Sequence, residues 1–220
     1  MVITNEMLGL SSSHIVFDDL DTPLHKDVVA PYQSLVNAAD SHGFGLRAAS
    51  GFRSFERQAL IWNAKLSGQR AVLDDEGLPL DLRPLTAKER VFVVLRWSAL
   101  PGASRHHWGT DFDIYDKFAL GQGDLQLTVA ETQRDGPFYD MYCWLNDYLP
   151  QTAFRRPYIK DTGGIAVEPW HLSYAPVAAA FEQALDKAVL REVIEKSELL
   201  LKEVVLAHLD EIFERFVLVT

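Results

Sequence analysis

The sequence contains a single cysteine, Cys143, among its 220 residues. No disulfide can therefore form within the chain, and a metal site would have to be built from histidine, aspartate and glutamate side chains. Cys143 lies in an apolar helical pattern, which predicts that it packs as a small hydrophobic side chain.

The sequence also lacks long hydrophobic runs and an excess of positive charge. No window approaches the roughly 20 apolar residues of a membrane span, and the start, MVITNEMLGLSSS, has neither the basic region nor the apolar run of a secretory signal. As written, the sequence favours a cytoplasmic location, or a periplasmic one if a leader precedes it. The formal net charge of −10 disfavours nucleic acid and anionic membranes as partners, because both select clustered lysine and arginine.

The chain has the size and composition of one globular domain with a terminal extension: 48% of its residues are hydrophobic and 24% are charged. Helices are expected at 27–43, from Ser54 to Gly68, from the capping box Thr86–Glu89 to Pro101, and at 138–149; strands are expected at 46–50, at 112–115 and on both sides of the turn at 161–164. This mixture lacks a regular βαβ alternation. It favours an α+β fold with a small, mainly antiparallel sheet.

The last part of the chain is rich in helix-forming residues. We expect residues 1–180 to form the main domain and residues 181–220 to form a helical extension packed on it, with Ser197 capping one of the helices. A dimerisation helix or a partner-binding face is the alternative for this extension, and the oligomeric state is left open.

The stretch SRHHWGTDFDIYD concentrates two histidines, a glycine and three aspartates. Alternate side chains of a strand face the same way, so Asp111 and Asp113 are expected to share one face. Gly109 can turn the chain so that His106 or His107 approaches Asp113. Taken alone, this pattern fits either half of a metal site or a solvated acidic strand.

A second stretch, VEPWHLSY, supplies Glu168 and His171. Residues three apart fall on opposite faces of a regular strand, but Pro169 is typical of a strand start or bulge, so Glu168 can precede the strand and turn back. A catalytic zinc site has three protein ligands and a water that a carboxylate can deprotonate. His106, Asp113 and His171 as ligands, with Glu168 as the base, would meet this requirement.

Together, the two stretches resemble the zinc signature of the VanY-like D-alanyl-D-alanine carboxypeptidases, whose wider group includes the D-Ala-D-Ala dipeptidases and the hedgehog signalling domain. The signature is Ser-x-His-x-x-Gly-x-x-x-Asp, followed downstream by Glu-x-Trp-His, and the segment SGFRS is similar to the family's Ser-Gly-Tyr-Arg-Ser block. The three blocks follow the family's order between Ser50 and Tyr174. Asp111 departs from the pattern, because the family more often has a small residue there, and it is expected to add a carboxylate near the metal.

The resemblance implies one zinc ion held by His106, Asp113 and His171. It selects His106 over His107, because only His106 has a glycine three residues and an aspartate seven residues after it. His107 is then expected to be a neighbour that lines the pocket.

The resemblance also implies that Glu168 is the catalytic base and that Arg53 stabilises developing negative charge. At the start of a helix, Arg53 could also hold a carboxylate of the substrate, and a surface salt bridge is the alternative for this residue. Contacts with substrate are expected from Ser104, Gln58 and Trp170. Trp170 alternates with a predicted ligand along the strand, however, so its side chain could instead face the core.

The implied activity is that of a D,D-carboxypeptidase, which hydrolyses D-alanine-containing peptides of peptidoglycan or muropeptides with metal-activated water. An endopeptidase that uses the same site is one alternative. A non-catalytic, zinc-stabilised binding module, as in the hedgehog branch, is another. The module is disfavoured because a structural zinc takes four protein ligands and needs no base.

Overall fold

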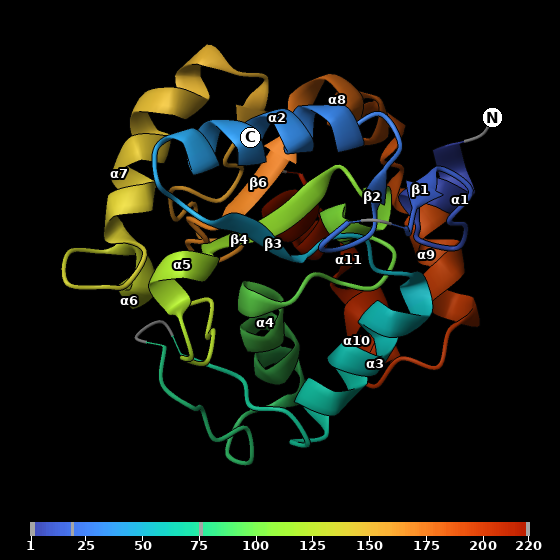
Figure 1. The fold of residues 1–220 in the computed structure, drawn as a ribbon. Coiled ribbons are helices and arrows are strands. Elements are labelled where there is room, and N and C mark those ends of the chain that lie inside the picture. Colours follow the sequence, from blue (N-terminus) through green and yellow to red (C-terminus); the bar gives the residue numbers. More distant parts are fainter. Residues whose placement is uncertain (1–2, 19, 75–76, 219–220) are drawn as a thin grey trace.

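The computed structural model describes residues 3–18, 20–74 and 77–218. Its fold is α+β, as predicted, with helices around a four-stranded antiparallel sheet and a separate two-stranded ribbon (Figure 1). The sheet runs in the order β3 (Leu46–Ser50), β4 (Asp111–Asp116), β6 (His171–Tyr174) and β5 (Phe154–Arg155), and the ribbon pairs β1 (Ile15–Val16) with β2 (Leu24–His25). Within the described ranges, no helix has the length and apolar character needed to cross a membrane.

Helices precede, interrupt and follow the sheet along the chain. They are α1 (Ile3–Met7), α2 (Val29–Ser41), α3 (Phe55–Leu66), α4 (Ala87–Trp97), the 3₁₀ turn η1 (Arg105–Trp108), α5 (Lys117–Leu120), α6 (Val129–Thr132), α7 (Tyr139–Tyr148), the 3₁₀ turn η2 (Leu149–Gln151), α8 (Ala175–Ala184), α9 (Lys187–Lys196), α10 (Lys202–Ala207), α11 (Leu209–Ile212) and the π turn η3 (Phe213–Val217).

Local signals account for the helix ends that matter most for the site. The Ser54 side chain accepts a hydrogen bond from Arg57 N and caps α3, as predicted. Thr86 and Glu89 form the predicted capping box at the start of α4. Gly68, with φ of +78°, follows the end of α3 in the left-handed conformation that glycine adopts without strain.

The larger sheet packs one face against apolar helices and turns the other toward polar groups. Phe112, Ile114 and Leu172 are fully buried on the first face, in a core shared with α2 and α7. A second apolar core joins α3 and α4 to the C-terminal helices. The polar face of the sheet therefore looks toward the layer formed by α3 and α4, and the candidate site lies between them (Figure 1).

The C-terminal segment is fixed to α3 by three hydrogen bonds. Trp62 Nε1 donates to Leu200 O at 3.1 Å, Asn63 Nδ2 donates to Glu198 O at 3.1 Å, and Leu200 N donates to Asn63 Oδ1 at 2.8 Å. Trp62 itself is fully buried in the second core. The division of the chain near residue 180 stays a prediction; that residue lies inside α8.

Two local predictions are wrong. Ser197 ends a helix instead of starting one: its Oγ donates to Ile194 O at 2.7 Å, and α10 begins only after Leu201, whose φ is +58°. Cys143 is exposed, because the buried side of α7 is formed by Met141, Tyr142 and Leu145.

Candidate active site

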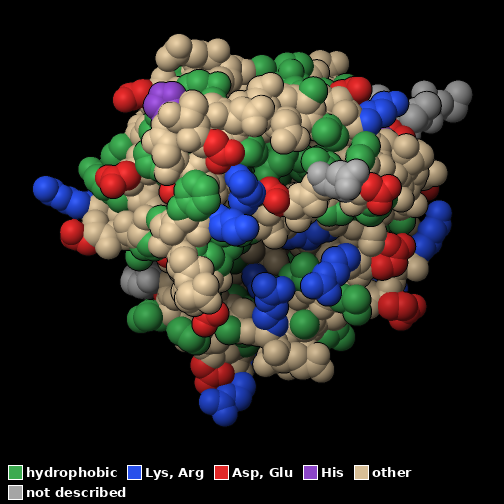
Figure 2. All heavy atoms as spheres, viewed as in Figure 1, with side chains coloured by type: hydrophobic (Ala, Val, Ile, Leu, Met, Phe, Trp, Pro, Cys, Tyr) green, Lys and Arg blue, Asp and Glu red, His purple; other side chains and the backbone are tan. Residues whose placement is uncertain are grey.

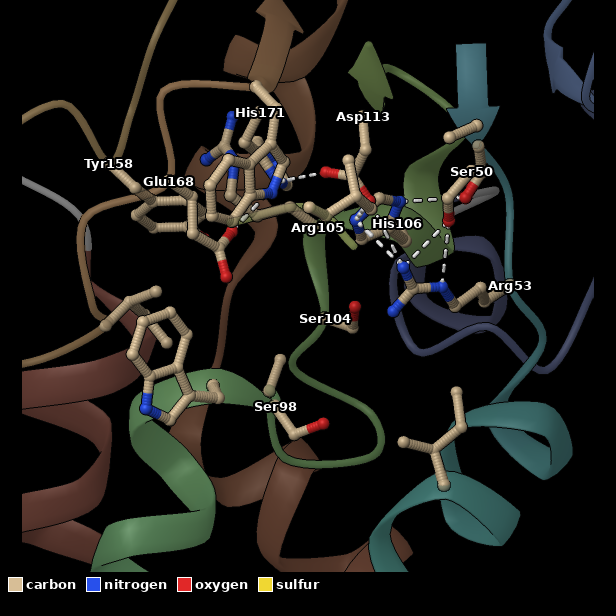
Figure 3. Close-up of a pocket in the computed structure, with 18 of the residues that line it drawn as sticks. Ser50, Arg53, Ser98, Ser104, Arg105, His106, Asp113, Tyr158, Glu168 and His171 are labelled. Carbon is tan, nitrogen blue, oxygen red and sulfur yellow. Dashed lines mark hydrogen bonds and ion pairs between the residues drawn. The ribbon is translucent and has the colours of Figure 1, made fainter. Parts of the chain in front are cut away.

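The structure brings His106, Asp113 and His171 together, although they come from three separate elements. Asp113 in β4 and His171 in β6 are direct partners in the antiparallel register, and His106 lies in η1. One ligand atom from each residue lies within 4.8 Å of those of the other two, and all three side chains are buried (Figure 3). This cluster is the one expected from the sequence.

Gly109 makes the short path from η1 into β4 possible. Its φ is +65°, and a Cβ atom at this position would lie 2.4 Å from Ile15 Cδ1 and 2.7 Å from His25 N. Only glycine fits both the conformation and the space. The turn places His106 beside Asp113, with Nε2 of the imidazole 3.5 Å from Oδ2 of the carboxylate.

The His106 imidazole is oriented by the backbone. Its Nδ1 lies 2.8 Å from Gly51 O, and because a carbonyl only accepts, Nδ1 carries the hydrogen and Nε2 keeps its lone pair. Burial, with Arg53 nearby, lowers the pKa of His106 to about 3, so the neutral form is favoured. A neutral imidazole held through its second nitrogen is the form that binds a metal ion.

Asp111 orients the imidazole of His171 from the side of the ring opposite Asp113. Its Oδ1 lies 3.1 Å from His171 Nε2, which leaves His171 Nδ1 facing Asp113. The same carboxylate accepts hydrogen bonds from Arg105 Nε, Thr110 Oγ1 and Ser173 Oγ. Asp111 shares the face of Asp113, as predicted, but it contacts the far side of His171 and is not part of the ligand cluster.

Two buried atoms of the cluster have no hydrogen-bond partner among the described residues: Asp113 Oδ1 and His171 Nδ1. They lie 3.3 Å apart. Buried polar groups are almost always paired, so these atoms indicate a partner that the chain does not supply. Two imidazole nitrogens and one carboxylate oxygen are a typical ligand set for catalytic zinc, and the residues therefore fit this metal.

The charge around His171 also favours a cation. Burial alone would lower its pKa, but Asp111, Asp113 and Glu168 raise the pKa of His171 well above its usual value. Positive charge at this imidazole is stabilised by three carboxylates, and a bound metal ion can provide it in place of a proton.

Arg53 reaches the cluster from the start of α3. Its guanidinium donates to Ser50 Oγ at 2.7 Å and to Asp113 Oδ2 at 3.4 Å, and it lies 3.5 Å from His106 Nε2 (Figure 3). An irregularity in the pairing of β3 with β4, between Ala48 and Ser50, brings Ser50 opposite Asp113. Arg53 is thus a fixed cation beside the candidate metal ligands.

His107 does not line the pocket, and that prediction is wrong. The imidazole is fully buried: Gly102 N donates to its Nε2 at 3.0 Å, and its Nδ1 donates to Arg53 O at 2.7 Å. Burial lowers the pKa of His107 to about 4, consistent with this neutral tautomer. His107 therefore links the backbone of Gly102 to that of Arg53 and fixes the position of Arg53.

Glu168 lies beside the cluster, where the cluster faces the cavity. It precedes β6, as Pro169 predicted, and its Oε2 lies 3.5 Å from His171 Nδ1. Its backbone N donates to Tyr158 O, and the Tyr158 ring packs edge-on against the His171 imidazole with centroids 4.8 Å apart. Both residues line a cavity of about 720 Å³ in front of the cluster.

The residues predicted to contact substrate occupy different places. Ser104 lies on the cavity wall, and so does part of Trp170, although most of the Trp170 ring is buried in the sheet core. Gln58 is fully buried and is not among the lining residues; its Oε1 lies 3.5 Å from Arg53 Nη1 and its Nε2 donates to Ala99 O. Gln58 therefore supports Arg53.

Sequence reasoning missed two charged residues of this region. Arg105, next to the candidate ligand His106, is buried and donates to Asp111, Ser173 and Glu182. Lys65, in the last turn of α3, is also buried and lines the cavity. The only sequence signal for Lys65 was its spacing of seven residues from Gln58 on one face of the helix.

Comparisons with known proteins give the family of this chain and several similar sequences. Residues 21–177 match the VanY family model, described as D-alanyl-D-alanine carboxypeptidase. An uncharacterized protein of Haemophilus influenzae is 45% identical over 107 residues, which are 46% of this chain and 72% of that protein. A D-alanyl-D-alanine carboxypeptidase of Enterococcus faecalis is 27% identical over 156 residues, which are 69% of this chain and 48% of that protein.

Among solved structures, the vancomycin resistance D,D-pentapeptidase VanY in complex with Zn(II) has a similar fold. The TM-score is 0.52 at 22% sequence identity, and the match covers 89% of this chain and 92% of that one.

Proposed function

Because the chain belongs to the VanY family of D-alanyl-D-alanine carboxypeptidases, we propose that it is a zinc peptidase that removes terminal D-alanine from peptidoglycan stem peptides or muropeptides. One observation carries the zinc assignment: Asp113 Oδ1 and His171 Nδ1 are buried, face each other and lack partners among the described residues. His106, Asp113 and His171 would hold the ion.

Bound zinc would supply a Lewis acid that polarises the scissile carbonyl and lowers the pKa of water. The chain would supply the proton transfers: Glu168 Oε2, on the open side of His171, would take a proton from the attacking water and pass it to the leaving amine. Arg53 would stabilise the negative charge that develops on the carbonyl oxygen. Asp111 and Gly51 would keep both imidazoles in the tautomers that bind metal.

A Glu168→Ala variant tests the role of the base. We expect it to keep about one zinc ion per chain and to lose roughly 10²- to 10⁴-fold in kcat, the usual contribution of a general base. Products from D-Ala-D-Ala-terminated peptides and defined muropeptides would be identified by mass: loss of one alanine indicates a carboxypeptidase, and internal cleavage indicates an endopeptidase.

The matched control is Glu195→Ala, which removes an exposed carboxylate from α9. It should hydrolyse the same peptides at the parent rate. Parent-like hydrolysis by Glu168→Ala would show that Glu168 is not the base. A zinc-loaded parent that cleaves none of the peptides would contradict the peptidase function itself.

A further inference from the structure

The cavity in front of the candidate metal ligands is lined by an excess of positively charged side chains. Among the residues that the structure describes, its lining includes the cationic side chains Arg53, Arg57, Lys65, Arg70 and Arg105, and two carboxylates, those of Asp113 and Glu168. Figure 2 shows Lys and Arg side chains gathered around the hollow in this face. This local excess contrasts with the net charge of −10 for the whole chain.

Two of these cations already have carboxylate partners. Arg105 is paired with Asp111 and Glu182, and Arg53 faces Asp113. Within residues 3–18, 20–74 and 77–218, no carboxylate lies within ion-pair distance of Arg57, Lys65 or Arg70.

Lys65 differs from the other two because it is buried. Only 8% of the residue is exposed, and within the described part of the chain its ammonium group makes one hydrogen bond, to Trp97 O at 3.3 Å, at the end of α4. An ammonium group carries three donors, so one backbone carbonyl leaves most of its capacity unused. Burial, with Arg70 nearby, lowers the pKa of Lys65 to about 8, although Glu168 acts in the opposite direction.

A buried cation that has no counter-ion among the described residues, on the wall of a cavity, is typical of a binding site for an anion. We propose that Lys65, with Arg70 near it, forms a carboxylate-binding subsite separate from the metal centre, which recognises a carboxylate group of the peptide. The proposal rests on the proposed peptidase function, because the ligand is taken to be the peptide that the metal centre cleaves.

The carboxylate has two possible sources in such a peptide. One is the free C-terminus, and its recognition would make the enzyme selective for terminal residues. The other is a side-chain carboxylate, and its recognition would select acidic stem peptides. Both sources present the same group to Lys65, so the experiment has to separate them.

Four acetylated peptides separate the two sources: Glu-D-Ala-D-Ala and Gln-D-Ala-D-Ala, each with a free C-terminus or a C-terminal amide. Dissociation constants would be measured by calorimetry on the zinc-loaded Glu168→Ala protein, so that turnover does not interfere. A charge-assisted hydrogen bond corresponds to roughly 10- to 100-fold in affinity. We expect a preference of this size for the free C-terminus over the amide, or for Glu over Gln.

In the Glu168→Ala protein, a second substitution, Lys65→Met, should reduce this preference to less than about 3-fold. Lys65→Arg should keep most of the preference. Arg70→Gln, at an exposed position that tolerates substitution, should reduce it by a smaller factor. Lys196→Met is the matched control: it removes the same charge from an exposed site on α9 and should change nothing.

A preference that survives Lys65→Met, or a protein that binds all four peptides equally, would overturn the subsite. The proposed function is tested separately, by measuring peptide hydrolysis with the parent protein, which retains Glu168. Hydrolysis without dependence on Lys65 refutes the subsite alone, and carboxylate selection by Lys65 without any hydrolysis refutes the peptidase alone.

Discussion

Asp111 accepts a hydrogen bond from His171 Nε2 at 3.1 Å, so the residue that departs from the family pattern acts behind a candidate metal ligand. Burial opposes its ionisation, but the Arg105 guanidinium and the hydrogen bond from His171 hold the pKa of Asp111 well below its usual range. An ionised carboxylate can only accept at this position. It therefore keeps the hydrogen on Nε2 and the lone pair on His171 Nδ1.

An Asp111→Asn variant should bind zinc about 10- to 100-fold more weakly than the parent, because the amide cannot accept from all of its present donors and loosens His171. Competition with a chromogenic chelator measures the affinity. Ser173→Ala is the control, since it removes one donor to Asp111 and leaves the contact with His171 in place. Equal zinc affinity in Asp111→Asn and the parent would refute the orienting role.

A His107→Ala variant should destabilise the protein by about 2–4 kcal/mol, because it opens a cavity and removes the partners of Gly102 N and Arg53 O. Zinc should still bind, since no ligand is changed. Chemical denaturation followed by circular dichroism gives the free energy of unfolding. His42→Ala, at an exposed position, should cost less than about 1 kcal/mol. A variant as stable as the parent would show that the two hydrogen bonds of His107 do not contribute to stability.

A Lys65→Met variant should stabilise the protein at neutral pH while it weakens carboxylate recognition. The low pKa of Lys65, about 8 against 10.5 in the unfolded chain, corresponds to a cost on the order of 3 kcal/mol for keeping the ammonium buried below pH 8. Thermal denaturation should show an increase in Tm of roughly 5 °C, with some of the gain lost because Trp97 O loses its donor.

The pH dependence of the difference in Tm distinguishes removal of a buried charge from better packing of the methionine side chain. Between about pH 8 and 10.5 the folded parent releases the Lys65 proton while the unfolded chain keeps it, so the parent gains stability relative to the variant. The difference in Tm should therefore shrink across this window. Arg70, Glu168 and Arg53 are the charged residues that act on the same ammonium group. A difference that stays constant up to pH 10.5 would contradict the electrostatic explanation.

Truncation after Ala184 should unfold the protein or make it insoluble. The residues beyond α8 complete the second apolar core, and Leu200 accepts the hydrogen bond from the fully buried Trp62. Soluble yield and the near-ultraviolet circular dichroism of the truncated chain measure this. A truncated chain with parent-like stability would show that the C-terminal helices do not stabilise the rest of the chain.

Local sequence patterns were sufficient for the parts of the site that depend on neighbouring residues. Strand alternation predicted that Asp111 and Asp113 share a face, and Pro169 predicted that Glu168 precedes the strand. The glycine at 109 predicted a turn. Each of these rests on backbone geometry within a few residues.

The sequence could not show the partners that come from distant segments. His107 was expected in the pocket because its true contacts, Gly102 and Arg53, are set by the packing of η1 on the start of α3. Lys65 was missed because its burial depends on where α4 ends. Ser197 has the side chain of a helix cap, but contacts between Leu200 and α3 hold this segment outside a helix.

The pairing of β4 with β6 has a consequence for how the length of this chain can change. The register sets Asp113 opposite His171 and Asp111 opposite Ser173, so one inserted or deleted residue in either strand would separate both pairs at once. The connection between the strands, which carries α5, α6, α7 and β5, has no such requirement at its exposed turns, such as residues 121–124. Between residues 111 and 173, insertions and deletions among homologues should therefore fall in this connection and be absent from 111–113 and 171–173.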